Sequence, residues 1–145
     1  MSELEGAHPD PDCMFCKIVA RELPAEIIDS DSKTVAFMDI NPATPGHALV
    51  IPRVHSKDLM EISDEDLAAC TIAARRLAKT MADTLDPEGL NVLNCCGTAA
   101  WQTVFHFHLH VVPRREDDPL KLPWIPQPGD SAEIEKTAAK IRGEG

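Results

Sequence analysis

Three histidines alternate with apolar residues where the chain reads His106-Phe107-His108-Leu109-His110. An extended strand points successive side chains to opposite faces, so we expect the three imidazoles to lie side by side on one face of a strand over residues 103–112. Neutral imidazole is a nucleophile near pH 7 and can attack phosphorus, giving a phosphoramidate that water cleaves. The middle histidine, with a neighbour on each side, is best placed for this attack. A transition-metal site and a solvated polar face are the two other interpretations.

Two pairs of cysteines are further candidates for chemistry. Cys13 and Cys16 form a Cys-x-x-Cys pair that offers two thiolates, and a closed structural zinc site needs four ligands. A redox pair is the alternative, although no thioredoxin-like pattern surrounds it. Cys95 and Cys96 are adjacent, and ordinary packing is the simplest interpretation for both. Five cysteines in a chain without an export signal do not favour a disulfide framework.

Residues 106–112 follow the pattern His-φ-His-φ-His-φ-φ, in which φ is an apolar residue. This segment resembles the signature of the histidine-triad (HIT) family. Three further segments, within residues 13–19, 37–55 and 97–114, also look like their HIT counterparts, so the resemblance spans roughly residues 13–115. It implies a dimeric α+β fold whose sheet continues across the two subunits, and chemistry at the α-phosphate of a nucleotide.

The resemblance implies roles for the histidines and for the polar pair before them. His108 would be the nucleophile, and His110 would contact the phosphoryl oxygens and the leaving group. His47 would support the triad from a neighbouring strand. Gln102 and Thr103 would lie near the bridging oxygen or the leaving group. The catalytic residues implied in this way are His47, Gln102, Thr103, His106, His108 and His110.

The resemblance also implies a nucleotide pocket. Asp39 would accept hydrogen bonds from the ribose hydroxyls, and Asn94 would contact phosphate or ribose unless Cys95 holds that position. An apolar slot would take a purine base. The alternatives are Asp39 as a turn former, His47 as a satisfied core residue, Thr103 as an ordinary strand residue, and the apolar residues as plain core. The implied nucleotide-binding residues are Phe15, Ile18, Phe37, Asp39, Ile40, Asn94, Gln102, Thr103, Val104, His108 and His110.

A structural zinc ion is the cofactor that the resemblance implies. Zinc-bearing HIT proteins and the related uridylyltransferases use two cysteines, a histidine after the apolar strand, and the first triad histidine. The matching residues in this chain are Cys13, Cys16, His55 and His106. Zinc there would anchor the N-terminal segment against the catalytic strand and hold His106 still beside the nucleophile. It would not activate water.

Hydrophobic periodicity and capping residues predict the elements that position these side chains. Ser63-x-x-Asp66 resembles a capping box, and apolar residues recur every three or four positions up to Leu85, which predicts one long helix. Asp12 is the expected cap of a short helix over 13–21. This order of elements predicts an α+β fold with a mostly antiparallel five-stranded sheet. The expected strands cover residues 27–28, 34–38, 47–51, 90–96 and 103–112, and a C-terminal helix covers 130–142.

Length and charge limit the possible classes of protein. A chain of 145 residues, 43% of them hydrophobic, suits one folded domain. We assign residues 1–12 to a flexible arm, 13–115 to the catalytic domain, and 116–145 to a Pro-rich segment with the C-terminal helix. The net charge of −10 disfavours nonspecific nucleic-acid binding, and no apolar run is long enough to span a membrane. The polar N-terminus lacks a signal-peptide pattern, so we expect a cytoplasmic protein.

The combined expectation is a homodimeric hydrolase that acts on a purine nucleotide or nucleotidyl conjugate. Nucleoside phosphoramidates and dinucleoside polyphosphates are the expected substrates, and a covalent nucleotidyl-histidine is the expected intermediate. A nucleotidyltransferase or phosphorylase is one alternative, although transferase relatives usually carry Gln where this chain has His110. A nucleotide-binding interaction module with little turnover is another. A metal-dependent hydrolase built on the three histidines is a more distant one.

Overall fold

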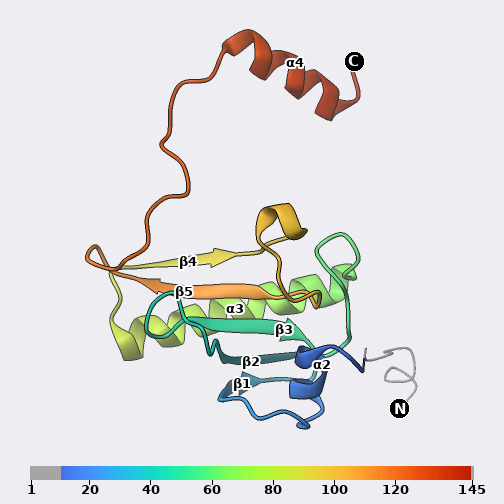
Figure 1. Ribbon diagram of the computed structural model, residues 1–145, viewed down its shortest axis with the longest axis vertical. Coiled ribbons are helices and arrows are strands. Elements are labelled where there is room, and N and C mark those ends of the chain that lie inside the picture. Colours follow the sequence, from blue (N-terminus) through green and yellow to red (C-terminus); the bar gives the residue numbers. More distant parts are fainter. Residues whose placement is uncertain (1–10, 145) are drawn as a thin grey trace.

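The computed structural model describes residues 11–144, so the expected flexible arm over residues 1–12 lies outside it except for its last two residues. Within this range, five antiparallel strands form one sheet in the order β1-β2-β3-β5-β4, accompanied by three α-helices and a short 3₁₀ helix, η1 (Figure 1). The predicted α+β class with a five-stranded antiparallel sheet is confirmed. The elements are α2 (Met14–Val19), β1 (Ile27–Ser30), β2 (Thr34–Met38), β3 (Ala48–Pro52), α3 (Asp64–Leu85), β4 (Gly89–Leu93), η1 (Thr98–Ala100), β5 (Leu109–Arg114) and α4 (Ser131–Arg142).

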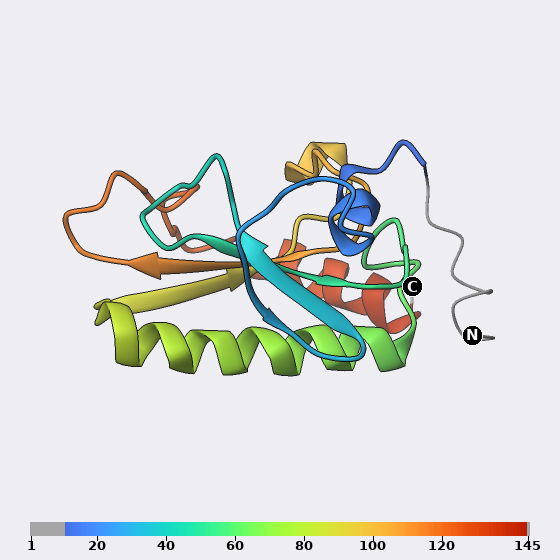
Figure 2. The same cartoon turned by 90° about the horizontal axis from the view of Figure 1, so that it is seen from below.

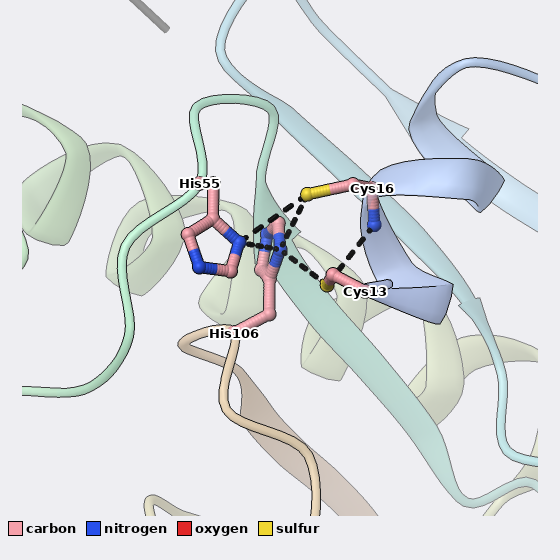
Figure 3. Close-up of side chains that lie close together, drawn as sticks. All are labelled: Cys13, Cys16, His55 and His106. Atoms are coloured by element: carbon pink, nitrogen blue, oxygen red, sulfur yellow. Dashed lines mark hydrogen bonds between the residues drawn. The ribbon is translucent and has the colours of Figure 1, made fainter. Parts of the chain in front are cut away.

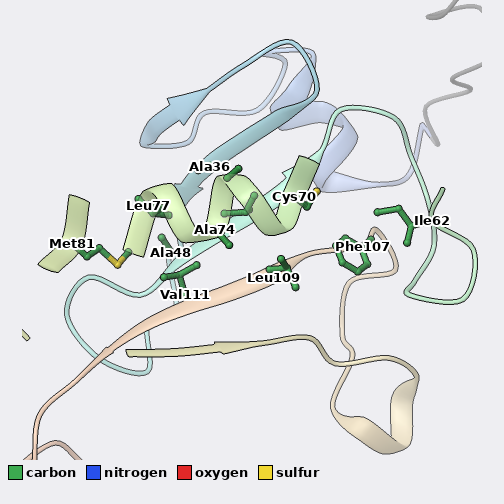
Figure 4. Packing of buried hydrophobic residues seen from close by; sticks show 12 residues of the cluster. Ala36, Ala48, Ile62, Cys70, Ala74, Leu77, Met81, Phe107, Leu109 and Val111 are labelled. Carbon is green, nitrogen blue, oxygen red and sulfur yellow. The ribbon is translucent and has the colours of Figure 1, made fainter. Parts of the chain in front are cut away.

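The long helix α3 covers one face of the sheet (Figure 2). It begins at the predicted cap, where the Ser63 hydroxyl accepts a hydrogen bond from the Asp66 backbone N–H at 3.1 Å. Three acidic residues in its first turn interact favourably with the positive end of the helix dipole. Its apolar stripe packs on β2, β3 and β5 and forms the main core (Figure 4). Members of this core include Val50, Cys70, Ala74, Leu77, Phe107 and Val111.

A second apolar cluster lies on the opposite face of the sheet, together with α2 (Figure 2). Strand residues alternate between the two faces, so Leu49 and Ile51 of β3 join this cluster while Val50 joins the main core. Phe15 of α2 packs edge-on against Phe37 of β2, with ring centroids 5.3 Å apart. The N-terminal helix is therefore held on the sheet face that also carries the site described below.

The strand that carries the triad begins later than predicted. β5 covers Leu109–Arg114 instead of residues 103–112, and only three of its residues pair with β3. Before β5, the Phe107 N–H donates to the Ser56 carbonyl at 2.7 Å and not to β3. Only His110 of the three histidines lies in the strand. The expectation that one strand carries all three is therefore wrong, although the ring centroids of His108 and His110 still lie 5.0 Å apart.

Two smaller expectations, the cap of α2 and the end of β4, also change. Cys13 and not Asp12 caps α2, because its Sγ accepts the Cys16 N–H at 3.4 Å. The C-cap of α3 is Asp86, whose φ of 48° is left-handed, so a non-glycine residue closes the helix. β4 stops at Leu93, three residues earlier than expected. The chain then reaches the triad through η1 and Trp101, which also has a left-handed φ of 77°.

The chain leaves the sheet after β5 and ends in α4, which stands apart from the rest of the fold (Figure 1). The predicted C-terminal helix is confirmed over Ser131–Arg142. We call residues 116–144 the C-terminal arm. Across the described residues, no helix is both long and apolar enough to cross a membrane. Large apolar side chains of the arm that are exposed are Leu122, Trp124, Ile125, Ile134 and Ile141.

Candidate functional site

His108 lies just before β5 and is almost completely buried, with 5% of its surface exposed. Its Nδ1 lies 2.8 Å from the backbone carbonyl oxygen of His106. A carbonyl only accepts hydrogen bonds, so Nδ1 carries the proton and the neutral ring keeps a lone pair on Nε2. Burial lowers the pKa of His108 below its usual value, which favours the neutral ring. His108 is therefore in the protonation state that a nucleophile needs.

His110 and His47 form a hydrogen-bonded pair next to His108. β3 pairs with β5 so that Leu49 lies opposite His110, which brings His47, two residues earlier, to the same face. Nε2 of His47 lies 2.9 Å from Nδ1 of His110, and the His108 and His110 ring centroids are 5.0 Å apart. Burial lowers the pKa of His110 to about 4 and also lowers the pKa of His47, so both rings are neutral at pH 7.

Asp39 and a backbone amide complete this cluster. Asp39 Oδ2 lies 3.5 Å from His47 Nε2, while Oδ1 accepts the Asn41 N–H at 2.8 Å. The turn-forming role of Asp39 is therefore present, together with a second oxygen that faces the histidines. The Ala43 N–H donates to His47 Nδ1 at 2.9 Å. Sequence reasoning missed this contact, because a backbone donor has no side-chain signature.

Gln102 braces the loop before the triad. Its buried side-chain amide accepts from the Gly97 N–H at 2.8 Å and donates to the carbonyls of Lys57 and Val104 at 2.9 and 3.1 Å. Both ends of the amide are thus engaged within the protein. Thr103, next to it, is exposed. Of the polar pair, Gln102 therefore stabilises the loop, and Thr103 faces solvent.

Asn94 offers an unused acceptor beside His108. Its Nδ2 donates to the His108 carbonyl at 3.0 Å, and its buried Oδ1 has no hydrogen-bond partner among the described residues. A buried acceptor without a donor costs free energy, so this oxygen is suited to a hydroxyl or N–H from a bound molecule. Cys95, the alternative for this position, is also buried, and burial raises the pKa of its thiol.

Most of the expected base-pocket residues belong to the second apolar cluster. The Phe15 ring lies edge-on to His106 and His108, with centroid distances of 5.9 and 5.2 Å. This cluster therefore borders the triad directly. Ile40 is 87% exposed and lies apart from the cluster. The expected pocket residues that are members of the cluster or pack against it are Phe15, Ile18, Phe37 and Val104.

All four expected zinc ligands converge next to the triad (Figure 3). The sulfur–nitrogen distances are 3.3 to 3.5 Å, and Nδ1 of His55 lies 3.2 Å from Nδ1 of His106. Tetrahedral bonds of 2.0–2.3 Å to zinc place ligand atoms about 3.3–3.8 Å apart, so the spacing fits. His106 Nε2 donates to the Pro52 carbonyl at 2.9 Å, which leaves Nδ1 free for a metal. The residues present therefore fit a four-coordinate zinc ion.

A cavity of about 400 Å³ lies at the other end of β5, away from His108. Its lining is mostly apolar and contains no triad histidine. The lining residues are Thr44, Pro45, Gly46, Leu85, Pro113, Arg115, Asp117, Asp118 and Pro119.

Comparison with known proteins gives one family and several relatives. The model of the HIT domain matches residues 20–117. The Schizosaccharomyces pombe protein named adenosine 5'-monophosphoramidase hnt1 is 35% identical over 130 residues, which cover 89% of this chain and 95% of the relative. The match to the HIT domain includes the cluster of histidines and Asp39 but begins after Cys13 and Cys16.

Two solved structures extend the likeness to the whole fold. SMU.412c from Streptococcus mutans superposes with a TM-score of 0.89 at 34% identity, covering 96% of this chain and 88% of that one. A Zn-bound histidine triad family protein from Mycobacterium smegmatis superposes with a TM-score of 0.73 at 38% identity, covering 92% of this chain and 98% of that one. Matches of this length extend into the segment before residue 20.

Proposed function

Because this chain belongs to the HIT family, we propose that it hydrolyses nucleotidyl conjugates at the α-phosphate through a covalent nucleotidyl-His108 intermediate. In the first step, the lone pair on His108 Nε2 attacks the α-phosphorus, and the bond between phosphorus and the leaving group breaks. The leaving group keeps the bonding electrons and takes a proton from solvent where it needs one. In the second step, water attacks phosphorus, the electron pair returns to Nε2, and the nucleoside monophosphate leaves.

The contact between His108 Nδ1 and the His106 carbonyl is the observation that carries this proposal. It sets the tautomer of His108, because the proton lies on Nδ1, in the hydrogen bond, and the lone pair therefore lies on Nε2. The neighbouring Phe15 ring and the burial of His108 exclude water from most of the imidazole. A neutral, poorly hydrated ring with a fixed tautomer can attack without first losing a proton.

The polar atoms around His108 suit a nucleotide. Asn94 Oδ1 can only accept, so its partner would be a ribose hydroxyl and not a phosphate oxygen. The Asp39 carboxylate would also accept from ribose, since it repels phosphate. Neutral His110 would donate to a phosphoryl oxygen, whose negative charge grows during transfer. A purine base would pack against the aromatic cluster that contains Phe15 and Phe37.

Nucleoside phosphoramidates are the substrate class that we propose first, with dinucleoside polyphosphates second. The name of the Schizosaccharomyces pombe relative, adenosine 5'-monophosphoramidase, supports this order. His110 supports hydrolysis over nucleotidyl transfer, because transferase relatives usually carry Gln at this position.

A structural zinc ion at Cys13, Cys16, His55 and His106 is part of the same proposal. The tetrahedral spacing of the ligand atoms and the free Nδ1 of His106 support it, as does the Zn-bound relative from Mycobacterium smegmatis. When bound, zinc would supply a rigid link between α2 and the triad and would not act as an acid or base. The chain's own residues carry out the reaction.

We also infer a homodimer. β4 is an edge strand of the sheet, and its Val92 and Leu93 side chains are exposed. An exposed edge strand with apolar side chains readily pairs with another strand, so a second copy could continue the sheet at this edge. The exposed apolar residues of the C-terminal arm offer a second surface for the same partner.

Mass spectrometry of the intact protein tests the covalent intermediate. We expect wild-type protein, mixed with a nucleoside phosphoramidate and denatured at alkaline pH, to gain the mass of one nucleotidyl group. His108→Ala removes the nucleophile, so it should form no adduct and lose on the order of 10⁴-fold or more in turnover. Lys79→Ala, on the exposed side of α3, is the matched control and should behave as wild type. Failure of the wild-type protein to form an adduct with any conjugate in a panel contradicts the proposal.

A further inference from the structure

The Ala43 amide, His47 and His110 form a continuous chain of hydrogen bonds. The Ala43 N–H lies 2.9 Å from His47 Nδ1, and His47 Nε2 lies 2.9 Å from His110 Nδ1. The chain ends at His110, whose ring centroid lies 5.0 Å from that of His108. Two of its members are imidazoles, and a neutral imidazole can carry its proton on either nitrogen. The direction of each hydrogen bond therefore depends on the one member of the chain that can only donate.

The member that can only donate is the Ala43 N–H, because it is a backbone amide. His47 Nδ1 must therefore accept, and neutral His47 carries its proton on Nε2. That proton points to His110 Nδ1, which must accept in turn. Neutral His110 is then left with its proton on Nε2, the ring nitrogen that His47 does not occupy. One backbone amide thus determines the tautomer of two successive imidazoles.

We propose that His47 is a positioning residue that holds His110 as a neutral imidazole with its proton on Nε2, so that His110 serves the reaction as a hydrogen-bond donor and not as an imidazolium acid. This inference rests on the proposed function and refines the part that His110 takes in it. A doubly protonated His110 would present a second N–H to His47 Nε2, which would have to give up its own proton. His47 could then stay neutral only by protonating Nδ1, and that position already receives the Ala43 N–H.

The surroundings of the two rings agree with this assignment. The groups that face them are Asp39, with Oδ2 3.5 Å from His47 Nε2, and the neutral ring of His108. Burial and the neighbouring histidines oppose a positive charge on His110, whereas Asp39 favours one and is the weakest of these influences. A neutral donor suits a phosphoryl oxygen, because its hydrogen bond strengthens as negative charge develops there. Neutral His110 keeps its Nε2 proton when it donates this hydrogen bond. No imidazole in the chain therefore becomes an anion.

Nuclear magnetic resonance of the protein with ¹⁵N-labelled histidine tests the assignment directly. Two-bond nitrogen–proton correlations at pH 7 distinguish protonated from unprotonated ring nitrogens. We expect both His47 and His110 in the full-length protein to show a protonated Nε2 and an unprotonated Nδ1. A proton on Nδ1 of His110, or protons on both nitrogens, overturns the proposal. The measurement needs no substrate, so it is independent of whether the adduct on His108 forms.

Two substitutions of His47 test whether it sets the tautomer of His110. In His47→Gln the side-chain N–H₂ reaches the place of Nε2 and keeps a donor for His110 Nδ1. In His47→Met a side chain of similar length offers no donor. We expect His110 to keep its single tautomer in the Gln variant and to show a mixture in the Met variant. Single-turnover adduct formation should fall by roughly tenfold in the Met variant, with nucleotide affinity unchanged, and should be partly recovered in the Gln variant.

Equal tautomer populations in the two variants overturn the role of His47, even if both lose activity. If the Met variant does not fold, the wild-type spectrum and the Gln variant still decide the question. Adduct formation in wild type without the expected tautomers would contradict this inference and leave the proposed function intact. The expected tautomers without any adduct would contradict the proposed function instead.

Discussion

His106 and His108 each use one ring nitrogen for a hydrogen bond to a backbone carbonyl, and the position of that carbonyl decides which nitrogen is left. His106 donates to the Pro52 carbonyl through Nε2, which leaves Nδ1 for the proposed zinc ion. His108 donates to the His106 carbonyl through Nδ1, which leaves Nε2 for the proposed attack on phosphorus. Two chemically identical side chains in one short segment therefore suit two different tasks. The difference comes from the backbone carbonyl that each ring contacts, since the side-chain type is the same.

The low pKa of buried His110 makes a prediction about stability and pH. Burial lowers the folded-state pKa of His110 to about 4, whereas an unfolded chain protonates histidine near its ordinary value of about 6.5. Below pH 6.5 the unfolded state binds more protons than the folded state, so the free energy of unfolding falls as pH decreases towards 4. His110→Gln removes this group. We expect the melting temperature of the Gln variant to fall less than that of wild type between pH 7 and pH 5, by a few degrees.

Calorimetry on the two proteins at matched zinc loading gives the comparison. His47, whose pKa burial also lowers, is present in both proteins and acts in the same direction. Parallel loss of stability in the two proteins would mean that His110 is not a buried neutral ring.

The types of the site residues could be predicted from the sequence, but their hydrogen bonds could not. His-x-His-x-His and Cys-x-x-Cys mark the candidate nucleophile and the metal ligands, because these residues are uncommon and their spacing is restrictive. The Ala43 amide and the Gly97 N–H leave no such mark, since every residue carries the same group. Gln102 illustrates the limit, because a polar residue before the triad is equally consistent with substrate contact and with the brace that the structure contains.

At the level of elements, we predict that the proposed zinc ion strengthens the attachment of α2 to the sheet, in addition to the apolar packing of Phe15. This α2 is a six-residue helix, too short to be stable alone, and Cys13 caps it while Cys16 lies within it. We predict about one zinc per chain in protein purified without chelator. Cys16→Ser should lower this content well below one, and the amides of α2 should then exchange with solvent faster while those of α3 stay protected. Metal analysis and hydrogen exchange measure the two effects.

Cys96→Ser is the matched control, since Cys96 lies outside the cluster. It should retain zinc and the protection of α2. Wild-type protein that contains no zinc, or a Cys16→Ser variant that keeps it, would remove the metal from the description of this site.

The loop before β3 depends on a glycine. Gly46 has a φ of 98°, and a Cβ there would lie 2.8 Å from Leu85 Cδ1 and 3.0 Å from Pro113 Cγ. The Leu85 side chain can move, but the proline ring is rigid. We predict that Gly46→Ala lowers the free energy of unfolding by about 2–3 kcal/mol, from the backbone strain and the overlap together. Urea unfolding checks the value.

Gly97→Ala separates these two causes. Gly97 has a φ of 93°, and a Cβ there would meet no atom within 4 Å, so only backbone strain remains, about 1 kcal/mol. Equal losses in the two variants would show that the contact with Pro113 adds nothing.

The order and type of the elements could be predicted, but the start of β5 could not. The alternation of apolar residues and histidines continues from residue 105 to 111, so the sequence pattern has no break at residue 108. The break comes from Ser56, whose carbonyl takes the Phe107 N–H, and from the convergence of His55 and His106. These are contacts between distant parts of the chain, and no local pattern contains them.

At the scale of the whole molecule, the C-terminal arm leaves its own sheet without burying its apolar residues. Ile134 and Ile141 are 59% and 82% exposed, although they share one face of α4. The match to the Streptococcus mutans structure covers 96% of this chain with a TM-score of 0.89, so it includes most of the arm. Exposed apolar residues on one face of such an arm favour burial against another surface, and we infer that a second copy of the chain supplies it.

Self-association therefore gives the test at this scale. We expect the full chain to sediment as a dimer, and Ile134→Glu with Ile141→Glu to raise the dissociation constant by about 10⁴-fold, since about 1.5 kcal/mol is lost per buried isoleucine, with two in each of two arms. Lys136→Gln with Lys140→Gln changes the net charge by the same two units on the opposite, exposed side of α4, and should leave the dimer unchanged. Equal weakening in both double variants would assign the effect to charge, and a dimer that persists in the glutamate variant would leave the β4 edge as its sole support. Both results contradict a docked arm, because apolar burial is specific to the face that carries the two isoleucines, whereas charge repulsion is not.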